Sequence, residues 1–279
     1  MRTFIVGAKG QLGAAFLERF GRNGWDHAAA DVDTLDIADP DAVMNAMTAY
    51  RPALIINCAA YNQVDKAETE PEKAFAVNAG GPRNLALAAR KLEAKLVHYG
   101  TDYVFDGEKG KPYVETDATG PLNAYGASKL KGEEYALQVP GALVFRLSWV
   151  FGRGTQNFIH KLRGWAGGPG PLKVTSDEIS VPTAAETAAD VTLAALGRGL
   201  SGRWHLANTG SCSRLEWARL ILKESGLEKE IVPASMEDFK LPARRPAFSA
   251  MSNRALCGEL GIAVPSWQEA TVRFIKENP

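Results

Sequence analysis

The amino-acid sequence predicts a doubly wound α/β fold, in which helices cover both faces of a parallel sheet. Short apolar runs alternate with amphipathic helical patterns, and a glycine-rich turn directly follows the first apolar run. Strands that alternate with helices form right-handed βαβ crossovers, which build such a sheet. After Trp149 the sequence becomes rich in Gly and Pro, which predicts a smaller C-terminal lobe.

The first part of the chain supplies strand and helix patterns in turn. Residues 2–7 (RTFIVG) are typical of a buried strand, and residues 11–24 form an amphipathic helical pattern that ends in glycine. Residues 27–32 predict a second strand. Residues 40–50 predict a helix that begins with proline, which suits the first helical position, and residues 53–60 predict a third strand.

The same alternation continues as far as Trp149. Residues 81–94 predict a helix and residues 95–102 a strand. Residues 122–136 predict another helix, and residues 142–152 predict the strand that follows it.

Composition excludes several classes of function. The chain has 279 residues, of which 46% are hydrophobic, so a large core is expected. Its 32 basic and 32 acidic residues balance, which argues against a dedicated nucleic-acid or anionic-membrane surface. No apolar run suits a signal peptide or a membrane span, so we predict a cytoplasmic protein. The three cysteines are widely spaced, which is typical of inert thiols and gives no zinc or redox pair.

The glycine-rich turn predicts a dinucleotide site. Gly7, Gly10 and Gly13 lie between a predicted strand and a predicted helix, where glycines let the backbone approach a pyrophosphate at the helix N-terminus. The spacing is not the standard G-x-G-x-x-G, so glycines that only ease packing are the alternative. Asp31 is placed to bond the adenosine ribose, and no Arg or Lys lies between it and Asp39 to bind a 2′-phosphate. We therefore expect NADH or NADPH, with a preference for NADH.

Tyr125 and Lys129 predict the chemistry. Residues four apart share one face of a helix, so the phenol and the ammonium would project into one space. An isolated Tyr-x-x-x-Lys pattern also fits an ordinary amphipathic helix. A nearby ammonium favours phenolate, so we expect Lys129 to lower the pKa of Tyr125 and to help it protonate a carbonyl oxygen.

Several motifs resemble the dTDP-4-dehydrorhamnose reductase family of extended short-chain dehydrogenases/reductases. The glycine turn and Tyr-x-x-x-Lys are shared by the whole superfamily. The narrower resemblance lies in blocks that occur in the expected order over nearly the whole chain: GQLG (10–13), AAYNQVDKAE (59–68), GTDYVFDG (100–107), ETDATGPLNAYGASKLKGE (115–133), FRLSWVFG (145–152) and PARRP (242–246).

The resemblance implies NAD(P)H-dependent reduction of dTDP-4-dehydro-L-rhamnose to dTDP-L-rhamnose. It makes Tyr125 the proton donor, and it implies that Lys129 also bonds the nicotinamide ribose while Thr101 hydrogen-bonds the sugar oxygen. It implies further cofactor contacts in the glycine turn, after the second and third strands, and just before Thr101. With Tyr125 and Lys129, these are Gly7, Gly10, Gln11, Leu12, Gly13, Asp31, Asp36, Ile37, Ala60, Tyr61, Asn62 and Tyr99.

The substrate contacts also follow from the resemblance. Trp149 matches a tryptophan that lines the sugar site, and Arg245 matches an arginine near the diphosphate. Asp102 follows Thr101 at the carboxyl end of a predicted strand, where open α/β sheets place ligands. A core tryptophan, a solvated arginine and a turn-forming Thr–Asp pair are the alternatives.

The resemblance divides the chain into two parts. Residues 1–148 would form a Rossmann-like dinucleotide-binding domain and residues 149–279 mainly a substrate-binding lobe, with residues about 180–208 returning to the first domain. No metal ligand set is predicted.

Four departures from the family pattern leave the exact sugar nucleotide open. Glu178 stands where a neutral amide is usual, and Ser180 where glycine is usual. Phe248 replaces an asparagine, and Gly100 replaces the serine before Thr101. A reductase of another 4-keto sugar nucleotide therefore remains an alternative.

Two other functions occur on related chains. Sugar-nucleotide dehydratases usually carry Thr-Asp-Glu where this chain has Thr-Asp-Tyr, and both they and the epimerases are usually longer. A non-catalytic, nucleotide-binding regulatory subunit is the second alternative, although Thr101, Tyr125 and Lys129 are all retained.

We expect a monomer or a weak homodimer without metal-dependent assembly. Some relatives dimerise through a magnesium site of glutamates, of which Glu186 matches one, but Ala15 stands where another would be. Size-exclusion chromatography should give the same elution volume with and without EDTA. A dimer that EDTA dissociates would contradict this expectation.

Overall fold

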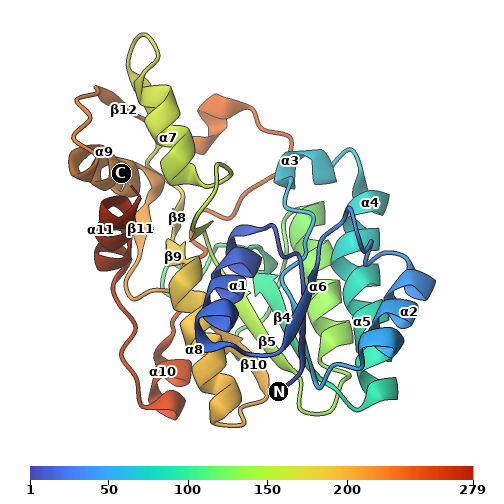
Figure 1. Ribbon diagram of the computed structural model, residues 1–279. Helices are drawn as coiled ribbons and strands as arrows, with labels where there is room; N and C mark the ends of the chain where they lie inside the picture. Colours follow the sequence, from blue (N-terminus) through green and yellow to red (C-terminus); the bar gives the residue numbers. More distant parts are fainter. Residues whose placement is uncertain (279) are drawn as a thin grey trace.

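The computed structural model describes residues 1–278, which contain a six-stranded sheet with the order β10-β5-β4-β3-β1-β2 (Figure 1). Every pairing in this sheet is parallel, so the predicted doubly wound α/β fold is confirmed. The strand order reverses between β1 and β3, which leaves a crevice at the carboxyl ends of these strands. The strands are β1 (Thr3–Val6), β2 (His27–Ala30), β3 (Leu54–Asn57), β4 (Lys95–Thr101), β5 (Leu143–Leu147) and β10 (Gly202–His205).

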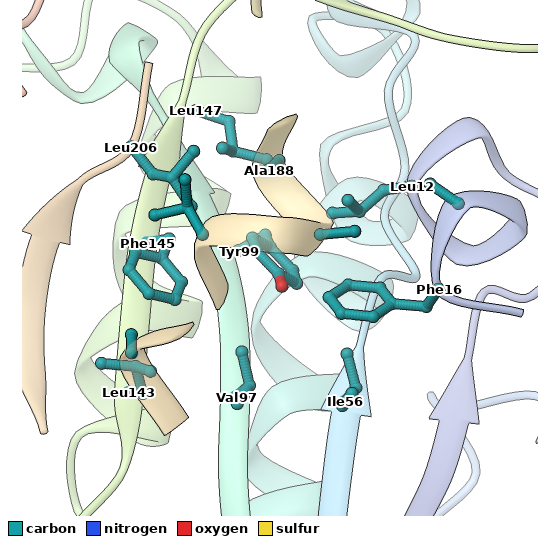
Figure 2. Close-up of a cluster of buried hydrophobic side chains, with 14 of the residues drawn as sticks. Leu12, Phe16, Ile56, Val97, Tyr99, Leu143, Phe145, Leu147, Ala188 and Leu206 are labelled. Carbon is teal, nitrogen blue, oxygen red and sulfur yellow. The ribbon is translucent and has the colours of Figure 1, made fainter. Parts of the chain in front are cut away.

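Helices cover both faces of the sheet because strand side chains alternate in direction. Ile5 joins a buried cluster with helices α1 (Gln11–Asn23) and α8 (Ala185–Gly197), whereas its neighbours Phe4 and Val6 face the opposite cluster. Figure 2 shows the first cluster, where Phe16 of α1 and Ala188 of α8 meet side chains of the central strands. The opposite face is covered by α2 (Pro40–Tyr50), α5 (Gly81–Leu92) and α6 (Ala124–Ala136).

The helix ends follow the signals in the sequence. Gly24 ends α1 in the left-handed conformation, with φ of 63°, which glycine adopts without strain. Asp39 caps α2 by accepting from the backbone N–H groups of Asp41 and Ala42, and Pro40 is the first helical residue. Asn123 caps α6 in the same way through the N–H of Gly126.

The sequence did not predict the structure between β3 and α5. This segment forms α3 (Val64–Ala67), α4 (Pro71–Phe75) and a π-helical turn, η1 (Ala76–Gly80). Asn78 of η1 is buried, donates to the hydroxyl of Ser128 on α6, and exchanges two hydrogen bonds with the backbone of Tyr61. The turn therefore connects α6 to the loop after β3.

A smaller lobe lies beside the sheet and has its own core around Trp217, Phe151 and Phe274 (Figure 1). The chain leaves this lobe to form α8, which packs against α1, and β10, which extends the sheet next to β5. The elements of the lobe are β6 (Val150–Phe151), α7 (Phe158–Ala166), β7 (Leu172–Thr175), β8 (Ile179–Ser180), β9 (Thr183–Ala184), β11 (Cys212–Ser213), α9 (Arg214–Glu224), β12 (Ile231–Ala234) and α11 (Trp267–Glu277). Short elements outside it are the 3-10 turn η2 (Asp102–Val104) and α10 (Arg254–Leu260), whereas the 3-10 turn η3 (Met236–Phe239) follows β12.

Two further properties concern the whole described chain. Over residues 1–278, no helix combines the length and the apolar character needed to cross a membrane. Cys58, Cys212 and Cys257 are free thiols, and burial raises the pKa of each. Raised pKa values keep thiols protonated and unreactive, in agreement with the inert role expected from their spacing.

Substitution of Gly132 should test the close approach of α6 to η1. A Cβ at Gly132 would overlap the backbone carbonyl oxygen of Asn78, so Gly132→Ala forces two backbones apart. We expect a loss of about 1–3 kcal/mol in the free energy of unfolding, and a fall of roughly 3–10 °C in the thermal midpoint. Gly21→Ala is the control, since nothing lies within 4 Å of a Cβ there. Equal midpoints for both variants would contradict the prediction.

Candidate functional site

One large cavity, of about 910 Å³, lies where the carboxyl ends of the sheet strands face the smaller lobe. Its lining combines the glycine turn, the ends of β3, β4 and β5, helix α6 and part of the lobe. This is the position at which open α/β sheets bind ligands. Twelve of the predicted site residues line it: Gly10, Gln11, Leu12, Ala60, Asn62, Tyr99, Thr101, Asp102, Tyr125, Lys129, Trp149 and Arg245.

The glycine turn is built for close backbone approach. Gly7 has φ of 74°, and a Cβ there would overlap the backbone between Cys58 and Ala59. Gly10 stands at the start of α1 without a side-chain cap, so the first N–H groups of the helix remain available to an anion. In the described structure the side-chain oxygen of Gln11 is buried without a hydrogen-bond partner. The two glycines and the free N–H groups fit a dinucleotide pyrophosphate, whereas the Gln11 oxygen is itself an acceptor and does not add to that fit.

Asp31 is held next to the glycine turn, although it is not among the residues that line the cavity. Its carboxylate accepts from the backbone N–H of Lys9 at 2.7 Å and from that of Val32 at 2.8 Å. The ammonium of Lys9 lies 2.6 Å from the carboxylate of Asp33. A cation therefore lies close to Asp31, because the glycine turn brings Lys9 next to it from outside residues 31–39.

Three other predicted cofactor contacts lie away from the cavity lining. Asp36 is exposed and accepts from the N–H of Ala38. The side chain of Ile37 is buried in the core beneath α2 and α5. Tyr61 turns its hydroxyl to Glu70, 3.1 Å away. The main cavity therefore does not include these three side chains.

Tyr99 contributes to the core through its side chain. Its ring packs between Phe16 and Phe145, and its hydroxyl pairs with Thr192 of α8 at 2.8 Å (Figure 2). The neighbouring His98 is buried too, pairs with Asn57, and has its pKa lowered by burial. His98 is thus a core histidine.

Lys129 is buried at the floor of the cavity. Its side chain is on α6, and its ammonium donates to the backbone carbonyl of Tyr99 at 2.5 Å. Burial lowers the pKa of Lys129 to about 8, against the opposing charge of Glu133 one turn further along the helix. Glu133 is itself fully buried and binds Arg146 of β5. The departure at Gly100 leaves room for this carboxylate, because a Cβ there would overlap it.

Tyr125 lies one turn before Lys129 on α6, as predicted, but the expected effect on its pKa is wrong. Burial raises the pKa of Tyr125 to about 12, opposed by Thr101 and reinforced by the charge of Asp102. The neighbouring Lys129 directs its ammonium to the carbonyl of Tyr99, and burial of the phenol outweighs any lowering by this charge. The Tyr125 hydroxyl lies 3.4 Å from the side-chain oxygen of Asn62. At neutral pH the phenol therefore keeps its proton.

Asp102 is enclosed by hydroxyl groups from both parts of the chain. Thr101 donates to one carboxylate oxygen at 3.2 Å. Ser180 at 2.8 Å and Ser249 donate to the other. Burial raises the pKa of Asp102 to about 6, although these three hydrogen bonds oppose the rise. The departure at Ser180 therefore adds a donor beside Thr101.

Arg245 is engaged in an ion pair across the cavity. Its guanidinium makes a two-point contact with the carboxylate of Asp65 on α3, at 3.0 and 2.8 Å. The Arg245 backbone neighbourhood is also fixed, since Asn123 donates to the carbonyl of Arg244. The solvated arginine weighed as an alternative is therefore wrong, because α3 supplies a carboxylate.

Sequence reasoning missed several residues that line the cavity. Asp65 and Lys66 lie inside the AAYNQVDKAE block, which carried the family resemblance without a role for either residue. Thr155, Gln156 and Lys161 come from the loop before α7 and from α7 itself. That Gly-rich loop has no periodic pattern, so no sequence signal could place it at the cavity.

Comparison with known proteins gives a consistent result. Residues 1–278 match the family model described as the RmlD substrate binding domain. A Mycobacterium tuberculosis protein named dTDP-4-dehydrorhamnose reductase is 40% identical over 267 residues, which cover 92% of this chain and 87% of that protein. Spore coat polysaccharide biosynthesis protein SpsK of Bacillus subtilis is 35% identical over 277 residues, covering 99% and 97% of the two chains.

A solved structure agrees with these relatives. The crystal structure of dTDP-4-dehydrorhamnose reductase from Bacillus anthracis in complex with NADP superimposes with a TM-score of 0.96. It is 34% identical in sequence, and the match covers 99% of each chain.

The depressed pKa of Lys129 predicts a pH-dependent effect on stability. The unfolded chain keeps the Lys129 proton up to its ordinary pKa, whereas the folded chain loses it near pH 8, so folding is favoured as pH rises between these values. The parent should therefore gain about 2 kcal/mol relative to Lys129→Met between pH 7 and 9.5, measured by urea unfolding. Lys131→Met on the exposed side of α6 should show no such change. A pH-independent difference for Lys129→Met would contradict the assignment.

Proposed function

Because this chain belongs to the dTDP-4-dehydrorhamnose reductase family, we propose that it reduces the 4-keto group of a deoxysugar nucleotide with a reduced nicotinamide cofactor. The substrate we propose is dTDP-4-dehydro-L-rhamnose, and the product is dTDP-L-rhamnose. One observation carries this proposal: Thr101, Tyr125 and Lys129 come from two separate elements and line one cavity, next to a glycine turn that fits a pyrophosphate.

The cofactor would lie across the switch point of the sheet. Gly10, Gln11 and Leu12 would hold the pyrophosphate, and Asp31 the adenosine ribose, with Asp36 and Ile37 near the adenine. Ala60 and Asn62 line the path to the nicotinamide end, with Tyr61 between them in sequence. When bound, the reduced nicotinamide would supply the hydride.

Tyr125 supplies the proton in this proposal. Reduction of a ketone leaves negative charge on the sugar oxygen, and the alcohol formed there resembles water, whose pKa is about 15.7. A phenol with a pKa of about 12 is therefore acidic enough to protonate that oxygen. A lowered pKa is not required, and Thr101 would hydrogen-bond the same oxygen beside Tyr125.

Lys129 acts as a fixed positive charge below Tyr125. Its pKa of about 8 leaves it protonated at neutral pH, and in this proposal its remaining N–H groups would donate to the nicotinamide ribose. The charge also favours the phenolate that forms when Tyr125 gives up its proton.

The smaller lobe would bind the sugar nucleotide. Trp149 offers an aromatic plane to the sugar, and Asp102 reaches the cavity beside Thr101. We place the diphosphate near Arg245, where Lys66 and Lys161 also line the cavity and add positive charge. In this proposal residues 1–148 bind the dinucleotide, and the lobe within residues 149–279 binds the substrate.

We propose that the enzyme uses NADH at least as well as NADPH. The carboxylate of Asp31 would repel a 2′-phosphate, whereas Lys9, paired with Asp33, partly offsets that repulsion. The KM for NADH should be equal to or lower than the KM for NADPH, and Lys9→Ala should raise only the KM for NADPH. A KM for NADPH well below that for NADH would contradict this preference.

Replacement of Tyr125 tests the proton donor. Tyr125→Phe removes the hydroxyl and keeps the ring, so kcat should fall by about 10²–10⁴-fold, followed as loss of NAD(P)H absorbance with dTDP-4-dehydro-L-rhamnose. Substrate affinity should stay within about threefold, because the ring still packs against Tyr103. Tyr135→Phe, on the same helix, is the control. A Tyr125→Phe variant as active as the parent would contradict the assignment, and a parent that binds nucleotide but never turns over would favour a regulatory subunit.

A further inference from the structure

We propose that Arg214 and Glu178 are positioning residues that set the shape of the sugar site. Their ion pair holds the ring of Trp149 on one side and the ring of Tyr103 on another, and these two rings line the cavity. This inference rests on the proposed function, because it assigns a sugar-selective role to the walls of that cavity.

Arg214 stacks on the ring of Trp149. It is the first residue of α9, and its guanidinium carbon lies 3.5 Å from the centre of the Trp149 ring. Arginine over tryptophan is the strongest common cation–π arrangement, since the flat guanidinium stacks on the ring face. Trp217 stacks on the same tryptophan at 5.8 Å and 11°. Trp149 is thus fixed by two planar groups.

The backbone at Trp149 needs such support. Its φ of 40° lies in the left-handed region, which is unusual for a bulky residue and costs free energy. A residue persists in this conformation only when its surroundings hold it there. The contacts with Arg214 and Trp217 are the interactions that hold this side chain.

Glu178 connects Arg214 to Tyr103, whose ring packs against Tyr125. It is only 6% exposed, and its two oxygens lie 3.3 and 3.4 Å from two nitrogens of Arg214. One of these oxygens also accepts from the hydroxyl of Tyr103 at 3.2 Å. The Tyr103 ring meets the Tyr125 ring edge-on, at 5.9 Å and 81°. A continuous series of contacts therefore joins Trp149 to Tyr125.

The ion pair acts through these rings. Trp149 and Tyr103 line the cavity, whereas Arg214 and Glu178 are not among its lining residues. Movement of the pair would change the positions of both aromatic walls without removing any group that touches a ligand. This separates a positioning role from direct binding.

Arg214 explains why a carboxylate, rather than a neutral amide, stands at residue 178. The Arg214 side chain is only 18% exposed, so its guanidinium, stacked on Trp149, is stabilised by an anionic neighbour. Glu178 supplies it, and a neutral amide, which is usual at this place in the resembling family, would not balance the charge. The presence of a glutamate at residue 178, where the family usually has a neutral amide, is thereby explained by its ion pair with Arg214. In this proposal the pair gives the chain its own arrangement of Trp149 and Tyr103 around the sugar.

Kinetic analysis of Arg214→Met and Glu178→Gln tests the inference. In Arg214→Met, the KM for the sugar nucleotide should rise about tenfold, while kcat and the KM for NAD(P)H stay within about threefold, because Trp149 loses its stacked partner. Preference for dTDP-4-dehydro-L-rhamnose over its C5 epimer should fall by a similar factor. Near-ultraviolet circular dichroism should lose intensity from the stacked tryptophans.

The double variant Glu178→Gln/Arg214→Met shows whether the two residues act as a pair or independently. Glu178→Gln alone leaves a partly buried guanidinium without its anion, so Glu178→Gln/Arg214→Met should be no worse than Arg214→Met alone. Additive losses would contradict the paired role. Arg273→Met is the control, since Arg273 forms an exposed ion pair with Glu277 on α11 and should leave every parameter unchanged.

The activity of the parent protein distinguishes a failure of the proposed function from a failure of the role assigned to Arg214 and Glu178. A parent that turns over the 4-keto sugar nucleotide, beside an Arg214→Met variant with the same KM, the same epimer preference and the same dichroism, would overturn the role of the ion pair. A general loss of folding would lower the thermal midpoint and affect both substrates equally, which would also overturn it. A parent without turnover would instead overturn the proposed function on which this inference rests.

Discussion

The buried ammonium of Lys129 is the interaction on which the rest of the site depends. It crosses from α6 to the carbonyl of Tyr99 near the end of β4, and so fixes the helix against the strand at the point where the cavity begins. Its charge faces Glu133, whose carboxylate is in turn held by Arg146 of β5. The close approach at Gly132 keeps the same helix against η1. These contacts fix the position of α6 against β4, β5 and η1. Tyr125 lies one turn before Lys129 on this helix and therefore lines the same cavity.

The second part of the site comes from contacts between the sheet and the smaller lobe. Asp102 follows β4, yet two of its three hydroxyl donors, Ser180 and Ser249, belong to segments that come more than seventy residues later. Arg245 likewise reaches back to Asp65 on α3. Polar groups of this kind are stabilising only when their partners are all in place. The cavity is therefore complete only when the lobe is seated against the sheet.

The sequence was sufficient for the sheet because the central strands are short, continuously buried and largely apolar runs. The helices also carry clear end signals, such as Gly24 and Asp39. It also placed Tyr125 above Lys129, since helical spacing alone determines that. It could not give the pKa of Tyr125, which depends on tertiary burial and on the position of Asp102. Pairs such as Lys9 with Asp33 join residues from separate loops, and no local pattern reports such contacts.

The path of the chain limits how the two parts can move. It enters the lobe after β5, returns through α8 and β10, and then passes into β11 and the lobe again. Because backbone segments join the two parts at more than one point, a displacement of the lobe must distort these connections together. Such a displacement would also break the hydrogen bonds that Ser180 and Ser249 donate to Asp102.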